Sequence, residues 1–158
     1  IICPNLLNQE IPFSYAEEEK AYRNYMDNVG FDKAFETVKN IVHAAKKHYQ
    51  KIFILGFSIG ATVAWRCSEL NVNAIVGYYG SRIRDYVEII PKCPTLLFFP
   101  TNEKSFDIEE LMSNLSESTV KTRVCIAAHG FTDPSSLDYD EGLTQSTMKE
   151  TLTFLEEN

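Results

Sequence analysis

The sequence has few cysteines and no motif typical of a metal or redox site. Its four cysteines are widely separated, and none belongs to a C-x-x-C pair. This spacing excludes the common zinc-binding and thioredoxin-type motifs. Cys67, Cys93 and Cys125 stand beside apolar residues, so we expect buried free thiols. Because the sequence also has no P-loop, no G-x-G-x-x-G motif and no histidine-rich ligand spacing, we expect neither a metal nor a cofactor.

Positive charge is also scarce. The chain has 15 basic and 22 acidic residues, a formal net charge of −7, and no dense run of Lys or Arg. Phosphate binding needs clustered positive charge, so nucleic acid is not an expected partner. No apolar stretch approaches the roughly 20 residues that span a membrane. Ile1-Ile2-Cys3 is also too short for a signal peptide and has no basic leader. We therefore expect a cytoplasmic protein without a membrane partner.

What is present is a regular alternation of strands and helices. The 158 residues, 44% of them hydrophobic, suit one domain over residues 1–158. Continuous apolar runs predict strands at 51–55, 74–79, 95–99 and 120–127, and a short one at 1–3. Periodic apolar residues predict helices at 31–49, 61–70, 108–115 and near the C-terminus, with a polar helix at 16–26. Fully apolar strands between helices indicate an α/β fold, a three-layer sandwich with a mostly parallel sheet and helices on both faces.

One pentapeptide suggests a chemistry. Gly56-Phe57-Ser58-Ile59-Gly60 lies between a predicted strand and a predicted helix, which is the nucleophile-elbow arrangement. The glycines allow neighbouring backbone to pass close to the serine in a tight turn. The alternative is an ordinary strand–helix turn that happens to contain a serine. If the elbow is correct, Ser58 is a nucleophile and the Ile59 backbone N–H is an oxyanion donor.

A serine hydroxyl needs a neighbouring base. His129 follows the last predicted strand directly, so it should lie at the same sheet edge as Ser58, where the carboxyl ends of parallel strands meet. A third, acidic residue should follow the preceding strand. Asp107 has a suitable place, but it also precedes a predicted helix, where it would be an N-cap. The residues alone leave these two roles of Asp107 open.

The chain resembles the dienelactone hydrolase branch of the α/β-hydrolases. The similarity rests on 56–61, on Gly77-Tyr78-Tyr79-Gly80, on 94–97, and on Ala128-His129-Gly130-Phe131. The resemblance implies hydrolysis of esters or lactones through an acyl-enzyme. It also aligns Ser105 with the aspartate of the family, so Asp107, Glu103 or no acid completes the triad.

Further differences from the family concern the nucleophile, the substrate and the start of the chain. Ser58 stands where the family often has cysteine, which points toward a generic esterase. Asp133 replaces an arginine that holds the substrate carboxylate in dienelactone hydrolase itself. Aligned on Cys3-Pro4, the chain begins after the strand whose loop supplies the second oxyanion donor, so only the Ile59 donor is expected.

These observations predict a serine hydrolase that acts on a small ester or lactone with Ser58, His129 and Asp107. Tyr79 and Arg82 are candidate substrate contacts, although a core role for Tyr79 and a solvated loop position for Arg82 are the alternatives. A homodimer is possible. The competing hypothesis is a hydrolase-fold binding protein without activity. The two differ in whether a carboxylate oxygen lies within hydrogen-bonding distance of His129 Nδ1.

Overall fold

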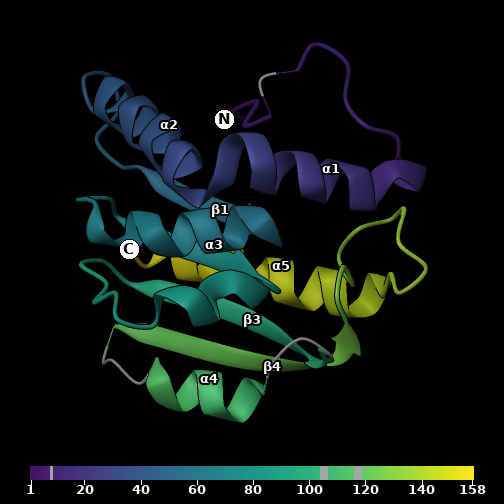
Figure 1. Ribbon diagram of the computed structural model, residues 1–158. Coiled ribbons are helices and arrows are strands. Elements are labelled where there is room, and N and C mark those ends of the chain that lie inside the picture. Colours follow the sequence, from purple (N-terminus) through teal and green to yellow (C-terminus); the bar gives the residue numbers. More distant parts are fainter. Residues whose placement is uncertain (8, 104–106, 116–118) are drawn as a thin grey trace.

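Four parallel strands form the centre of the molecule. The computed structural model describes all residues except 8, 104–106 and 116–118, and its sheet has the order β1-β2-β3-β4 (Figure 1). Each strand pairs in parallel with the next along the chain. Their carboxyl ends therefore meet at one edge of the sheet. The strands are β1 (Phe53–Phe57), β2 (Ala74–Tyr78), β3 (Thr95–Asn102) and β4 (Val120–Ala128).

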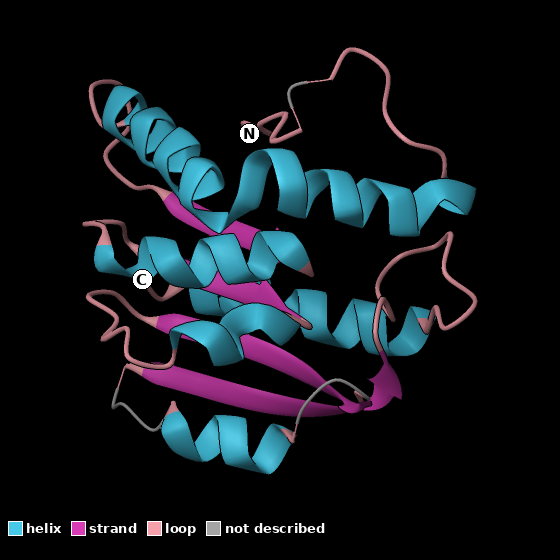
Figure 2. Ribbon diagram, in the orientation of Figure 1, coloured by secondary structure: helices cyan, strands magenta, loops and turns pink. Residues whose placement is uncertain are grey.

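Helices cover both faces of this sheet (Figure 2). On one face lie α2 (Gly30–Ala45), α3 (Ile59–Arg66), the 3-10 helix η4 (Ser81–Tyr86) and α4 (Ile108–Asn114). The other face packs against α5 (Glu141–Glu156), with Tyr78, Phe98 and Phe154 in the shared core. This arrangement confirms the predicted α/β three-layer fold. It follows from the mostly apolar sequences of β1, β2 and β3, which place apolar side chains on both faces of the sheet.

A polar helical segment precedes α2. It consists of η1 (Tyr15–Glu17), α1 (Glu18–Asn24) and the π-helical η2 (Tyr25–Val29), and it ends at Gly30 with φ 67°. No residue of α1 is buried, but Tyr25 of η2, which lies within the polar helix predicted at 16–26, is buried. A further short 3-10 helix, η3 (Cys67–Glu69), extends α3. None of the helices in the described part of the chain is both long enough and apolar enough to cross a membrane.

The first residues of the chain correct one prediction. Residues 1–5 are irregular, Ile1 and Ile2 are exposed, and the predicted strand at 1–3 does not form. Three residues followed by Pro4, which has no N–H, offer too few ladder hydrogen bonds to hold a strand. Among the described residues β1 therefore pairs on one side only, with β2.

Candidate active site

Ser58 occupies a strained turn between β1 and α3. Its φ of 52° and ψ of −116° lie outside the regions that L-residues favour. A Cβ on Gly56 would lie 2.1 Å from the carbonyl oxygen of Gly60, so this turn requires glycine at position 56. A Cβ on Gly60 would meet no atom within 4 Å, so the steric argument does not extend to the second glycine. The Ser58 N–H donates to the Tyr78 carbonyl at 2.9 Å and ties the turn to the end of β2.

Three side chains from three strand ends form a continuous chain of contacts. Ser58 Oγ lies 3.0 Å from His129 Nε2, and His129 Nδ1 lies 3.2 Å from Glu103 Oε2. Glu103 follows β3 and His129 follows β4. The Glu103 side chain is 10% exposed and that of His129 is 38% exposed. An Nδ1–H that donates to the carboxylate leaves Nε2 free to accept from the serine hydroxyl, which is the arrangement a general base needs.

Asp107 does not take part in this chain of contacts, so the prediction that it orients His129 is wrong. It is the N-cap of α4, where its Oδ1 accepts hydrogen bonds from the N–H groups of Glu109 (2.9 Å) and Glu110 (3.1 Å). The first N–H groups of a helix have no partner within the helix, so a nearby carboxylate satisfies them locally. Glu103, the alternative, contacts His129 instead. Ser105, which aligns with the family aspartate, lies outside the described residues.

The first turn of α3 lies next to the serine. Ile59 is the first residue of this helix, so its N–H is one of those without an intrahelical acceptor. Such a helix N-terminus favours negative charge. The Ile59 N–H is therefore suited to donate a hydrogen bond to an oxyanion, as the sequence predicts.

A depression of about 400 Å³ opens onto Ser58 and His129. Besides Ser58, Glu103 and His129, its wall comes from α1 and η4 and consists of Glu18, Glu19, Tyr22, Ser81, Arg82 and Arg84. Sequence analysis missed the three α1 residues, because a polar, acidic helix carries no pattern that distinguishes a pocket wall from an ordinary exposed face.

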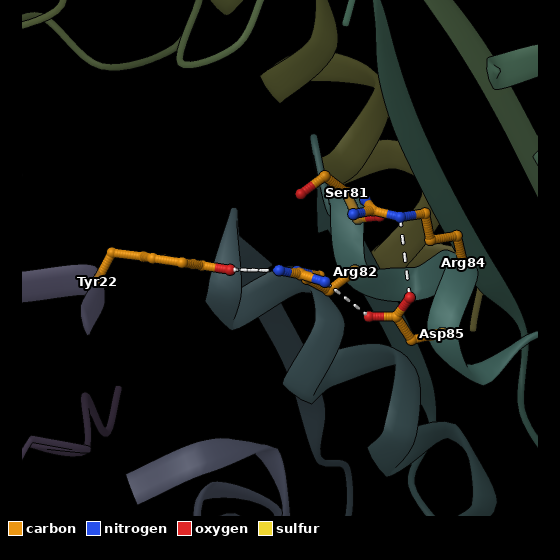
Figure 3. Close-up of polar contacts among 5 residues, drawn as sticks. All are labelled: Tyr22, Ser81, Arg82, Arg84 and Asp85. Atoms are coloured by element: carbon orange, nitrogen blue, oxygen red, sulfur yellow. Dashed lines mark hydrogen bonds and ion pairs between the residues drawn. The ribbon is translucent and has the colours of Figure 1, made fainter. Parts of the chain in front are cut away.

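Arg82 connects the two walls of this depression (Figure 3). Its Nη2 and Nε donate to the Tyr22 hydroxyl at 2.9 and 3.2 Å, and its Nη1 lies 3.2 Å from Asp85 Oδ2. The hydrogen bond with Tyr22, and to a smaller extent Asp85, raises the pKa of Arg82 above its ordinary value. Arg82 therefore keeps its charge, lines the pocket and holds α1 next to η4.

Tyr79 lies in the core, which is the alternative to a substrate contact that the sequence left open. Its side chain is only 5% exposed, and Tyr79 is not among the described residues that line the depression. Its hydroxyl forms a 2.7 Å hydrogen bond with Thr132 Oγ1, and its ring centroid lies 4.9 Å from that of His129. The structure therefore places Tyr79 against the histidine rather than on the pocket wall.

Comparisons with known proteins identify the family of the chain. The profile of the dienelactone hydrolase family matches residues 1–158. The chain belongs to the dienelactone hydrolase family. This membership confirms the resemblance found in the sequence and places the chain in a family of hydrolases.

Two similar proteins add detail about the fold and the extent of the match. The "Uncharacterized protein YczH" of Bacillus subtilis (strain 168) is 38% identical over 154 residues, which are 94% of this chain and 74% of that protein. The crystal structure of "Putative Dienelactone Hydrolase" from Klebsiella pneumoniae subsp. pneumoniae MGH 78578 superposes with a TM-score of 0.75 at 16% identity. The match covers 93% of this chain and 69% of that one. At this identity the second comparison shows the shared fold alone.

Proposed function

We propose that this member of the dienelactone hydrolase family is a serine hydrolase that cleaves a small ester or lactone through an acyl-enzyme. The observation that carries the proposal is the line of contacts from Glu103 through His129 to Ser58. These residues come from the ends of three different strands. A strained serine, an imidazole within hydrogen-bonding distance and a carboxylate on the other ring nitrogen are the components of nucleophilic acyl transfer.

The reaction would proceed in two steps. Ser58 Oγ forms a bond to the carbonyl carbon while its proton passes to His129 Nε2. The tetrahedral intermediate then collapses, the C–O bond to the alcohol breaks, and His129 returns the proton to the leaving oxygen. Water, deprotonated by His129, then forms a bond to the acyl-Ser58 carbonyl carbon, the bond from this carbon to Ser58 Oγ breaks to release the acid, and His129 returns the proton to Ser58 Oγ. Glu103 stabilises the imidazolium in both steps, and the Ile59 N–H faces the developing oxyanion.

The pocket supports a small, polar substrate. Its volume is about 400 Å³, and charged residues dominate its wall. Arg82 keeps its proposed role as a substrate contact, because it lines the depression beside Ser58 and Tyr22 holds its guanidinium in place. Asp133, which replaces the arginine of dienelactone hydrolase, accepts a hydrogen bond from the Ser135 N–H within its own loop. This residue gives no support to dienelactone as the substrate.

The contact between Glu103 and His129 also bears on the competing hypothesis of an inactive binding protein. That hypothesis rested partly on Ser105 in place of the family aspartate. A carboxylate 3.2 Å from His129 Nδ1 supplies what Ser105 does not, so it favours the enzyme.

The proposal is tested by intact-mass labelling with a fluorophosphonate probe. Wild-type protein should gain one adduct, and Ser58→Ala and His129→Ala should lose it while keeping their circular dichroism spectra. Unlabelled protein is then mixed with esters and lactones of different acyl length, and the compounds that slow subsequent labelling by the probe are tested as substrates. Absence of an adduct on folded wild-type protein would refute an activated serine.

A further inference from the structure

Tyr79 shares with Ser58 a backbone conformation that proteins rarely tolerate. Among the described residues, these two are the only ones other than glycine with positive φ, 43° at Tyr79 and 52° at Ser58. Strained residues persist where surrounding contacts hold them, and they cluster at functional sites. Tyr79 follows β2 directly, and its N–H donates to the Phe98 carbonyl of β3 at 2.7 Å. This hydrogen bond to the neighbouring strand therefore holds the strained backbone of Tyr79 in place.

The side chain that this backbone carries is enclosed by rings and by the loop after His129. The Tyr79 ring lies 5.5 Å from the Phe131 ring in an edge-on arrangement and 4.9 Å from the His129 ring, at an interplanar angle of 56°. Its hydroxyl bonds to Thr132 Oγ1, three residues beyond His129. Burial is the main cause that raises the pKa of Tyr79 above its ordinary value, so its hydroxyl stays protonated near neutral pH. One residue thus contacts both the histidine and the loop that carries it.

We infer that Tyr79 and Thr132 are positioning residues that hold the His129 imidazole between Ser58 and Glu103. The inference rests on the proposed function, since it assigns a task in the same site. His129 lies in a loop and its side chain is 38% exposed, so its two hydrogen bonds alone leave the imidazole open to tilting. The Tyr79 ring closes one side of the imidazole, and the hydroxyl pair anchors this ring to the loop. Tyr79 itself does not line the substrate pocket.

The chain offers a matched control in the neighbouring residue. Tyr78 is also buried, and its hydroxyl also forms a 2.7 Å hydrogen bond with a threonine, Thr151 of α5. No ring contact joins Tyr78 to His129 among the described pairs. Tyr78→Phe and Tyr79→Phe therefore remove equivalent hydrogen bonds, but only the second affects the surroundings of the histidine.

The kinetic experiment compares Tyr79→Phe, Thr132→Val, their combination and Tyr78→Phe on p-nitrophenyl acetate. We expect kcat to fall roughly 3–10-fold in each single variant at position 79 or 132, the effect of one lost hydrogen bond, with KM unchanged. The double variant should be no slower than either single one, because both remove the same bond. Tyr78→Phe should keep the wild-type kcat, because phenylalanine retains the ring and the backbone carbonyl that contact the turn at Ser58. A raised KM at constant kcat, or an equal loss in Tyr78→Phe, would overturn the inference.

A second measurement keeps the inference testable without turnover. The protein has three histidines, so the ring signals of His129 in ¹⁵N-histidine-labelled protein are identified by their loss in His129→Asn. We expect them to shift or broaden in Tyr79→Phe and to stay unchanged in Tyr78→Phe. Such a change in protein that hydrolyses no ester would refute the proposed function but support the positioning role. Unchanged signals in active protein would refute the positioning role alone.

Discussion

The assignment of Glu103 rather than Asp107 as the acid of the site can be tested by replacing each with its amide. Glu103→Gln keeps the shape of the side chain and retains an oxygen that accepts from His129 Nδ1, but it removes the negative charge. Asp107→Asn does the same at the N-cap of α4, where asparagine caps a helix as well as aspartate. The two variants therefore separate the charge beside the histidine from the charge at the helix.

The expected size of the effect follows from the geometry of the Glu103–His129 pair. Two unit charges 3.2 Å apart attract by roughly 1.3 kcal/mol in bulk water and about 5 kcal/mol at an effective dielectric constant of about 20. Since about 1.4 kcal/mol corresponds to a tenfold change in rate, the range is about 10-fold to several-thousand-fold. Glu103 is nearly buried but His129 is partly exposed. We therefore expect Glu103→Gln to slow acylation about 100–1000-fold.

The assay is the rate of fluorophosphonate labelling, followed by intact mass, together with hydrolysis of p-nitrophenyl acetate. Asp107→Asn should keep the wild-type rate and stability. Asp107→Ala should lose about 1 kcal/mol of folding stability through the missing cap, without a loss of rate per folded molecule. A variant Glu103→Gln that reacts as fast as wild type, or Asp107→Asn that is equally impaired, would refute the assignment.

Three further predictions concern the turn, the thiols and the pocket. Gly56→Ala should lower the free energy of unfolding by at least about 3 kcal/mol, because its Cβ would overlap the Gly60 carbonyl. Gly60→Ala should leave the free energy of unfolding unchanged or raise it by up to about 1 kcal/mol, since this residue lies in α3. Equal losses of stability in urea denaturation would contradict this prediction. With a disulfide reagent at pH 8, only the exposed Cys3 should react in folded protein, and all four thiols should react after denaturation. The other three thiols are buried, and burial raises the pKa of Cys67 to about 12. Rapid reaction of a second thiol in folded protein would contradict this prediction. Arg82→Gln should raise KM for a good ester substrate about 3–10-fold with little change in kcat. The reason is that Arg82 lines the pocket but does not touch Ser58 or His129 in any described contact. An unchanged KM would show that Arg82 does not contact the substrate.

Most of the fold could be predicted because its determinants are local. The predicted strands 74–79 and 120–127 match β2 and β4 within one residue. β2 is a continuous apolar run, whereas the first half of β4 includes Lys121, Thr122 and Arg123. The prediction at 1–3 failed because three apolar residues were counted as a strand without a partner for their backbone groups. Strand pairing is a tertiary property, and a short apolar run does not reveal whether a neighbour exists.

The site was less predictable for the same reason. The local pattern around Asp107 indicates an N-cap as clearly as a catalytic acid, and only the position of His129 distinguishes them. Glu103 and His129 are 26 residues apart in the sequence, and Tyr22 and Arg82 are 60 apart. No spacing rule connects such pairs. Ser58 and His129 could be predicted because each directly follows a strand, whose end the sequence does indicate.

The position of β1 in the sheet links the stability of the elbow to β2. Among the described strands β1 has a single neighbour, and Leu55 and Phe57 remain 42% and 38% exposed. Within the sheet the turn at Ser58 is therefore tied to β2 alone, by the Tyr78 carbonyl and by packing of Phe57 on the Tyr78 ring at 5.0 Å. Tyr79, the next residue, contacts His129. The end of β2 thus supports both the nucleophile and the base, although neither belongs to it, which explains why the second strained residue of the site lies there.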